Sequence, residues 1–240
     1  MSRIERAIIL AAGLGTRLRP ITYEIPKPLI TVNGKRMIDT IIDGLHENGI
    51  DEIYIVVGHL KEKFECLKEK YKELVFIDNP YYNTCNNISS LYVARDYLEN
   101  CMIMDADQII YNPNILSSDF DKSGYNCTWT NDYTSEWLLT TNEQGFVTSC
   151  SRTGGKEGWR LYSISRWNQD DGIKLKKHLE EEFSIKNNTE IYWDDIALFC
   201  YPDDYQLVIY EMKENDMLEI DSIEELVTID KNYKEYMKRR

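Results

Sequence analysis

The sequence lacks any long hydrophobic run. None of the apolar stretches in its 240 residues approaches the roughly 18 residues that a membrane-spanning helix requires. The N-terminal segment MSRIERAIIL leads straight into a strand pattern, without the apolar core and small-residue exit of a cleavable signal peptide. We therefore expect a cytoplasmic protein with no membrane span.

Paired cysteines are also missing. The six cysteines are scattered along the chain, with neither Cys-x-x-Cys nor histidine-paired spacing. In a reducing compartment, cysteines of this kind are most simply buried small hydrophobic residues. Their spacing therefore argues against a zinc or redox site.

Positive charge is scarce. The chain has 28 basic and 41 acidic residues, which gives a formal net charge of −13. A field of that sign repels nucleic acid, and no basic stripe compensates for it, so we expect no DNA or RNA partner. An anionic substrate would need a local positive pocket or a metal ion, which makes the positions of the few cations informative.

The first half of the sequence alternates strand and helix patterns. Short apolar runs predict buried strands, with helical patterns between them: strands at 7–10, 53–57, 75–77 and 102–104, helices at 37–48, 61–71 and 88–98. This order predicts an α/β fold with a doubly wound, mostly parallel, Rossmann-like sheet.

The second half has a different pattern, which predicts a mixed-sheet extension. Strand-like segments lie near 125–130, 136–141, 145–151 and 159–165, and helical segments at 169–183 and 221–238. The chain contains no repeat and no long linker, so we expect one domain over residues 1–240.

A glycine loop, Leu10-Ala11-Ala12-Gly13-Leu14-Gly15-Thr16-Arg17, follows the first strand. Gly13 and Gly15 let backbone N–H groups approach phosphate oxygens at the edge where parallel sheets bind ligands. The loop is neither a Walker A motif nor a full dinucleotide fingerprint, because Leu18 stands where a third glycine would be. Taken alone, it equally fits an ordinary tight turn.

Two cations near this loop favour a phosphate site. Arg17 lies two residues after Gly15, and Lys27 stands between Pro26 and Pro28. The two rigid prolines lower the entropy cost of presenting the lysine charge. In so acidic a protein, these neighbouring cations predict a pocket for an anion.

Carboxylates close the fourth predicted strand, in Asp105-Ala106-Asp107. Residues i and i+2 share one strand face, so one or both could hold a hard cation such as Mg²⁺ that bridges phosphate oxygens. A strand-end turn is the alternative explanation.

Aromatic and acidic residues gather in the second half, at Trp137 and in Tyr192-Trp193-Asp194-Asp195. Aromatic faces with nearby carboxylates form a site for an organic cation. A single tryptophan is more often part of the core or its rim. Adjacent carboxylates, however, are costly to bury without a cationic partner.

The glycine loop and the segment Pro26-Lys27-Pro28-Leu29 together resemble the signature of nucleotidyltransferases that attach a nucleoside monophosphate to sugar phosphates or alcohol phosphates. The resemblance implies that Gly13, Gly15, Arg17 and Lys27 contact the triphosphate. It also implies that Asp107 holds Mg²⁺ together with a late acidic residue. Asp221 fits that second role, although it equally suits a helix N-cap.

The downstream segments Asn86–Leu91, Glu136–Leu138, Tyr192–Ile196 and Glu219–Asp221 resemble those of bacterial CTP:phosphocholine cytidylyltransferases. The resemblance spans the chain and implies CMP transfer from CTP to phosphocholine, with Mg²⁺, by in-line attack at the α-phosphorus. It divides the chain into a nucleotide-binding core, about 1–112, and an acceptor-binding part, about 113–240.

The resemblance assigns residues to three groups. The catalytic residues are Arg17, Lys27 and Asp107, and the acceptor-binding residues are Trp137, Tyr192, Trp193, Asp194 and Asp195. The nucleotide-binding residues are Leu10, Ala11, Ala12, Gly13, Gly15, Thr16, Arg17, Lys27, Gly58, Asn79, Asn87, Ser89 and Asp105.

Other functions stay open on the sequence. CMP transfer to 2-aminoethylphosphonate would place an ammonium in the same cage, and a sugar-1-phosphate nucleotidyltransferase would differ in the acceptor half. The abundance of tryptophan favours phosphocholine, because trimethylammonium needs only apolar faces and a diffuse negative charge. A silent nucleotide-sensing subunit should have lost Lys27, Asp107 or Asp221, and all three are present. The oligomeric state is left open.

Overall fold

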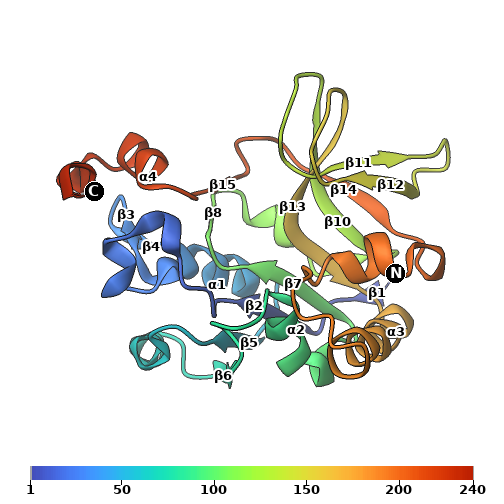
Figure 1. Cartoon of the computed structure of the whole chain (residues 1–240), viewed down its shortest axis with the longest axis horizontal. Helices are drawn as coiled ribbons and strands as arrows, with labels where there is room; N and C mark the ends of the chain where they lie inside the picture. The colour runs from blue at the N-terminus through green and yellow to red at the C-terminus, as the bar shows by residue number, and fades with distance from the viewer. Residues whose placement is uncertain (1, 240) are drawn as a thin grey trace.

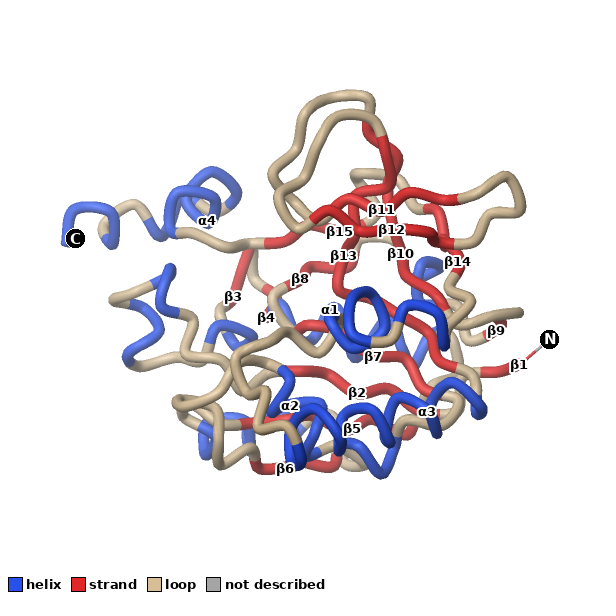
Figure 2. Tube along the Cα trace, turned by 45° about the vertical axis from the view of Figure 1, so that its right-hand side comes forward, coloured by secondary structure: helices blue, strands red, loops and turns tan. Residues whose placement is uncertain are grey.

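The computed structural model describes residues 2–239 and is built around a nine-stranded sheet (Figures 1 and 2). Its strand order is β12-β11-β13-β7-β2-β5-β6, and β10 pairs with β13 and β14. The strands of this sheet are β2 (Arg6–Leu10), β5 (Glu52–Val57), β6 (Val75–Asp78), β7 (Cys101–Asp105), β10 (Gly124–Thr130), β11 (Leu138–Thr141), β12 (Val147–Ser151), β13 (Gly158–Trp167) and β14 (Val208–Glu211).

The parallel part of the sheet comprises β7, β2, β5 and β6, with helices on both faces. One face is covered by α1 (Met37–Glu47), and the other by α2 (Ile88–Val93) and α3 (Gln169–Glu180). Successive residues of β2 alternate between the two clusters, since Ile9 packs toward α1 and Ile8 toward α2. The predicted doubly wound α/β class is confirmed.

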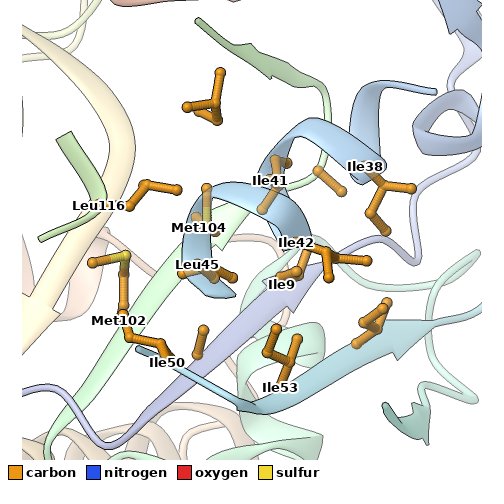
Figure 3. Close-up of a cluster of buried hydrophobic side chains, with 14 of the residues drawn as sticks. Ile9, Ile38, Ile41, Ile42, Leu45, Ile50, Ile53, Met102, Met104 and Leu116 are labelled. Carbon is orange, nitrogen blue, oxygen red and sulfur yellow. The ribbon is translucent and has the colours of Figure 1, made fainter. Parts of the chain in front are cut away.

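Helix α1 shows how the sequence pattern produces this arrangement. Ile38, Ile41, Ile42 and Leu45 follow the spacing of one helical face, and all four are fully buried against the sheet (Figure 3). The helix ends at Glu47, and Gly49, two residues further on, has a φ of +70°, the left-handed conformation that favours glycine.

Strand β13 joins the two halves of the chain. Along one edge it pairs antiparallel with β10 over Gly158–Arg166. Along the other edge it pairs antiparallel with β11 near its start and with β7 over Ile164–Trp167. The predicted mixed-sheet extension is therefore present, as part of the same sheet. Strand β14 and three shorter strand pairs outside this sheet have no counterpart among the predicted strands. The pairs are β1 (Ser2–Arg3) with β9 (Asp119–Phe120), β3 (Thr31–Val32) with β4 (Lys35–Arg36), and β8 (Gln108–Ile110) with β15 (Met217–Glu219).

Three predicted helices differ from the structure. The segment expected at 61–71 is a 3₁₀ helix over Lys61–Glu69, and the one at 88–98 is α2 followed by a 3₁₀ turn at Arg95–Tyr97. The segment at 169–183 is α3, which continues as a π-helical turn at Glu181–Ile185. Another π-helical turn, unpredicted, spans Ile196–Cys200.

The prediction of one closing helix at 221–238 is wrong. Helix α4 covers only Ile223–Ile229, and 3₁₀ turns follow it at Lys231–Tyr233 and Tyr236–Arg239. The break lies at Asp230, which has an extended backbone and whose carboxylate accepts hydrogen bonds from the backbone N–H groups of Asn33 and Asn232. These bonds hold the C-terminal segment beside β3 and β4 (Figure 1).

No helix within residues 2–239 has the length and apolar character needed to cross a membrane.

Candidate active site

A pocket of about 330 Å³ lies at the carboxyl ends of β2 and β7, where open parallel sheets bind ligands. It is lined by segments far apart in the sequence, such as those of Arg17 and Asp221, which are in contact although 204 residues separate them. The following predicted nucleotide and metal residues line it: Leu10, Ala11, Ala12, Gly13, Gly15, Thr16, Arg17, Lys27, Asn87, Ser89, Asp105, Asp107 and Asp221.

The fold requires glycine at one of the two loop glycine positions and not at the other. Gly15 has a φ of +59°, and a Cβ there would lie 2.9 Å from the Thr22 Cγ2 atom, so the turn itself requires glycine. At Gly13 a Cβ would meet no atom of the described residues within 4 Å. Gly13 is therefore not demanded by the fold, and its open surroundings suit close approach of a ligand phosphate.

Lys27 links the glycine loop to the acidic strand end. Its Nζ donates to Asp107 Oδ2 at 2.8 Å and to Asp221 Oδ1 at 2.9 Å, and its side chain is only 10% exposed. Burial lowers the pKa of Lys27, but the charges of Asp107 and Asp221 raise it more, so the net shift is upward. The amine therefore stays charged at the mouth of the pocket.

Arg17 reaches the same carboxylate from the loop. Its Nη2 donates to Asp221 Oδ1 at 2.7 Å. Asp221 is not the N-cap of α4, because Ser222 occupies that position and forms a capping box with Glu225. The Asp221 side chain is thereby left to face Arg17 and Lys27.

The acidic groups around Lys27 fit a divalent cation. Asp107 Oδ1 is buried and has no hydrogen-bond partner among residues 2–239. Burial, and after it the charges of Asp107, Asp221 and Asp105, raise the pKa of Glu219 to about 8. Burial and the charges of Asp107 and Asp194 likewise raise the pKa of Asp105.

Within residues 2–239, no group of three or more His, Cys, Asp or Glu side chains is arranged to hold a metal ion by itself. Mg²⁺ in phosphoryl-transfer sites usually takes one or two carboxylates and completes its shell with waters and substrate phosphates. The pair Asp107 and Asp221 meets that smaller requirement.

Two predicted nucleotide-binding residues lie outside the described lining of the pocket. Asn79 is fully buried, and its Nδ2 donates to Ser89 Oγ and Ser90 Oγ at 3.0 and 3.1 Å. A Cβ at Gly58 would lie 2.7 Å from the ring of Tyr82, which does line the pocket. In the structure both residues support the wall and do not form it.

Sequence reasoning missed part of that wall. Tyr82 and Cys85 line the pocket beside the expected Asn86 and Asn87. They follow β6 on an irregular segment, so no periodic pattern marked the face they present. The close packing of Tyr82 against Gly58 is the feature that marks this ring as part of the pocket wall, and it is visible only in three dimensions.

The aromatic residues of the second half divide into two sets. Trp137 makes edge-to-face contacts with Tyr192 and with Phe199, with ring centres 5.6 Å apart in each case. Trp193 is only 1% exposed and contacts the rings of Tyr125 and Trp167 in the core. The structure therefore places Trp137 and Tyr192 at a surface site, to which it adds Phe199. Trp193 was predicted to belong to the same cage, but it lies in the core behind that site.

The two adjacent carboxylates also differ. Asp195 Oδ1 accepts from Arg152 Nη2 at 2.6 Å, while Asp195 Oδ2 accepts from the Tyr192 backbone N–H at 2.9 Å. Asp194 is buried, and its Oδ1 has no hydrogen-bond partner in the part of the chain that the structure describes. Burial raises the pKa of Asp194 to about 7.

The aromatic site and the pocket are connected by hydrogen bonds. Asn87 Oδ1 accepts from the Trp193 backbone N–H at 2.9 Å, and Asn86 Nδ2 donates to the Glu190 carbonyl at 2.9 Å. Both asparagines line the pocket. The arrangement thus places the pocket of the glycine loop and its cations beside a separate aromatic and acidic site.

This fold and this pocket define a nucleotidyltransferase. Residues 6–130 match the family described as nucleotidyl transferase, and the chain belongs to that family. It is an enzyme of this class whose full-length relatives are cytidylyltransferases, as the comparisons below show.

The chain is 34% identical over 229 residues to 2-aminoethylphosphonate cytidylyltransferase of Lancefieldella rimae, covering 95% of this chain and 92% of that protein. It is 36% identical over 221 residues to choline-phosphate cytidylyltransferase of Streptococcus pneumoniae, covering 92% and 94%. The solved structure of the CTP:phosphocholine cytidylyltransferase from S. pneumoniae matches with a TM-score of 0.87 and 34% identity, covering 95% of this chain and 98% of that one. The predicted relationship to this group is confirmed.

Proposed function

We propose that the protein transfers CMP from CTP to phosphocholine, with Mg²⁺, and releases pyrophosphate. The observation that carries the acceptor is the aromatic site formed by Trp137, Tyr192 and Phe199. Its Tyr192 belongs to the same turn as Asp194, whose buried Oδ1 has no hydrogen-bond partner among residues 2–239. Aromatic faces attract a quaternary ammonium group through their quadrupoles, and a nearby carboxylate supplies the counter-charge. We further propose that residues 1–240 act as one cytoplasmic domain.

In this proposal the triphosphate lies on the glycine loop. Backbone N–H groups near Gly13 meet its oxygens, and Arg17 and Lys27 neutralise their charge. The acceptor phosphate is already anionic, so its oxygen attacks the α-phosphorus without a general base. Lys27 and Arg17 hold the charge that develops on the transferred and leaving groups.

Asp107 and Asp221 would hold the Mg²⁺. When bound, this ion supplies further neutralisation of phosphate charge. The buried Oδ1 of Asp107, which lacks a partner among residues 2–239, supports this assignment. Lys27 then turns from these two carboxylates toward the substrate phosphates.

A second acceptor, 2-aminoethylphosphonate, is favoured by one feature of the site. Its ammonium needs hydrogen-bond acceptors, and Asp194 Oδ1 is an acceptor with no described partner. A relative that is 34% identical over nearly the whole chain carries this name. The aromatic walls favour phosphocholine, and the carboxylate serves both cations.

A pyrophosphate-release assay tests the proposal. Four nucleoside triphosphates are crossed with phosphocholine, 2-aminoethylphosphonate and glucose-1-phosphate, in the presence of Mg²⁺. We expect turnover with CTP and phosphocholine. Activity with glucose-1-phosphate alone would refute phosphocholine as the acceptor.

A Trp137→Ala variant adds a site-specific arm to this assay. Loss of about 1–2 kcal/mol of cation–π attraction predicts a rise in the acceptor KM of roughly 5- to 30-fold, with little change for CTP. Trp129→Ala is the matched control, because Trp129 is a half-exposed ring that contacts Trp159 instead of the proposed cage. Equal effects of the two variants would contradict the proposed cage.

A further inference from the structure

Arg152 is a cation already seated beside the proposed acceptor cage. Its guanidinium carbon lies 3.8 Å from the ring centre of Phe199 and 5.7 Å from that of Trp137. Its Nη2 and Nε donate to Asp195 Oδ1 at 2.6 and 3.1 Å. One side chain therefore joins two aromatic walls to a carboxylate whose side chain is only 3% exposed.

Asp195 uses both of its oxygens within the protein. Oδ1 accepts from Arg152, and Oδ2 accepts from the Tyr192 backbone N–H, which closes the turn that carries the Tyr192 ring. The structure therefore gives Asp195 a different task from the counter-charge predicted for it. Its neighbour Asp194 is not paired with Arg152 and keeps a buried Oδ1 with no hydrogen-bond partner in the described chain.

The backbone that presents Arg152 is held against the loop that carries Trp137. Thr134 and Gly155 exchange two backbone hydrogen bonds, at 2.9 and 3.0 Å. A Cβ at Gly154 would overlap the carbonyl oxygen of Thr134, so this close approach requires glycine. Ser151 Oγ also donates to the Gly154 carbonyl at 2.6 Å. The glycine-rich loop after β12 therefore fixes where Arg152 can reach.

We propose that Arg152 is a positioning residue for acceptor recognition. With Asp195 it holds the Tyr192 turn against Trp137 and Phe199. By neutralising Asp195, it leaves Asp194 as the carboxylate of this adjacent pair that meets the acceptor's cation. This inference rests on the proposed function and adds to it a residue on which the shape and charge of the cage depend.

Removal of Arg152 affects the acceptor side selectively. Asp195 would be left as a buried charge without its partner, which forces the turn to rearrange. Displacement of a binding group by about 1 Å can cost as much as about 100-fold, so we expect a rise in the acceptor KM of roughly 10- to 100-fold. Arg152 does not line the nucleotide pocket described above, so the KM for CTP stays within about twofold of the wild-type value.

The experiment measures KM for CTP and for acceptor, kcat, and melting temperature in Arg152→Gln, Arg152→Lys, Asp195→Asn and the double variant Arg152→Gln/Asp195→Asn. Lysine keeps the charge but lacks the planar guanidinium that stacks on the rings. The acceptor KM of Arg152→Lys should therefore lie between those of wild type and Arg152→Gln. The double variant should be less impaired than Arg152→Gln alone, because Asp195→Asn removes the buried charge that the loss of Arg152 leaves unpaired. If Arg152→Gln does not fold, Arg152→Lys and Asp195→Asn carry the same test.

Arg95→Gln is the matched control. Arg95 also stacks on a ring, 4.2 Å from the centre of Tyr92, and its Nε pairs with Glu180 at 3.0 Å, away from the cage. This variant should leave both KM values unchanged.

The outcomes separate this inference from the proposed function. A wild-type enzyme that transfers CMP to neither phosphocholine nor 2-aminoethylphosphonate refutes the proposed function. An active wild type whose Arg152→Gln variant keeps its acceptor KM, raises both KM values equally or binds acceptor more tightly refutes the role of Arg152 alone. Additive effects in the double variant refute it as well.

Discussion

Replacing Lys27 with Met removes the cation at the centre of the site while keeping a side chain of similar length. The amine donates to Asp107 Oδ2 at 2.8 Å and to Asp221 Oδ1 at 2.9 Å, and the side chain is 10% exposed. Methionine fills the same space with an adaptable apolar chain, so the main change is one of charge.

The expected loss of activity is large. Removal of one preorganised group facing the developing charge costs about 2.7–4 kcal/mol, or about 100- to 1,000-fold in kcat. Pyrophosphate release at saturating CTP and acceptor measures it. Lys61→Met is the control, because the Lys61 amine pairs with Asp78 at 2.6 Å and both side chains are about half exposed. This control should stay within about twofold of wild type.

The same variant also tests the metal site without measuring activity. In Lys27→Met, Asp107 and Asp221 face each other without their shared cation, so the free protein melts at a lower temperature. Mg²⁺ at 100 times its Kd stabilises the folded state by about 2.7 kcal/mol, which corresponds to roughly 5–10 °C for a chain of this size. At the same Mg²⁺ concentration, the rise in melting temperature should be smaller in wild type, because Lys27 competes with the ion for the same carboxylate oxygens.

Two results would refute this reasoning about Lys27. A kcat within about threefold of wild type would remove the residue from the mechanism. Equal Mg²⁺-induced shifts in melting temperature would show that Lys27 and the metal do not share Asp107 and Asp221.

The remaining predictions concern the glycine loop and pH. Gly15→Ala should destabilise the fold by about 1–3 kcal/mol, because Gly15 has a φ of +59° and an added Cβ would press on Thr22. Gly13→Ala should keep the melting temperature and raise the KM for CTP roughly tenfold. Similar melting temperatures for the two variants would contradict this. Because burial raises the pKa of Asp194 to about 7, its charge appears as pH rises through that value, so kcat/KM for the acceptor should rise between pH 6 and 8. Asp194→Asn should lose that dependence, and identical profiles for the two proteins would refute the role of this carboxylate. Since folded Asp194 binds its proton more tightly than the unfolded chain does, its contribution to stability should fall as pH rises from about 4 to about 7, which thermal melts of both proteins can measure.

The nucleotide half could be predicted because its chemistry follows from strand order. Carboxyl ends of neighbouring parallel strands meet at one edge, so a glycine loop after β2 and the carboxylates after β7 had to lie close together. The pairing of β2 with β7, in which Leu10 lies opposite Asp105, produces this proximity.

The acceptor half could not be predicted in the same way. Tyr192 is half exposed and the next residue, Trp193, is buried, because a tight turn and a π-helical segment replace any regular period there. Likewise, Asp194 and Asp195 are chemically equivalent in the sequence. They are told apart by Arg152, which lies 43 residues away from Asp195 in the chain and donates to one carboxylate and not to the other.

Strand β13 has a further consequence for the range of acceptors. Its Leu161 N–H donates to the Trp137 carbonyl, and its Ile164 pairs with Met104, the residue before Asp105. The backbone at Trp137 and that at Met104 are therefore fixed about three residues apart along β13, or roughly 10 Å. This separation is set by backbone hydrogen bonds, so under the proposed function side-chain substitutions in the cage would change which head group is recognised but leave the spacing unchanged. The proposed site would thereby sort acceptors by the number of atoms between cation and phosphorus, and a longer spacer would have to fold back to fit.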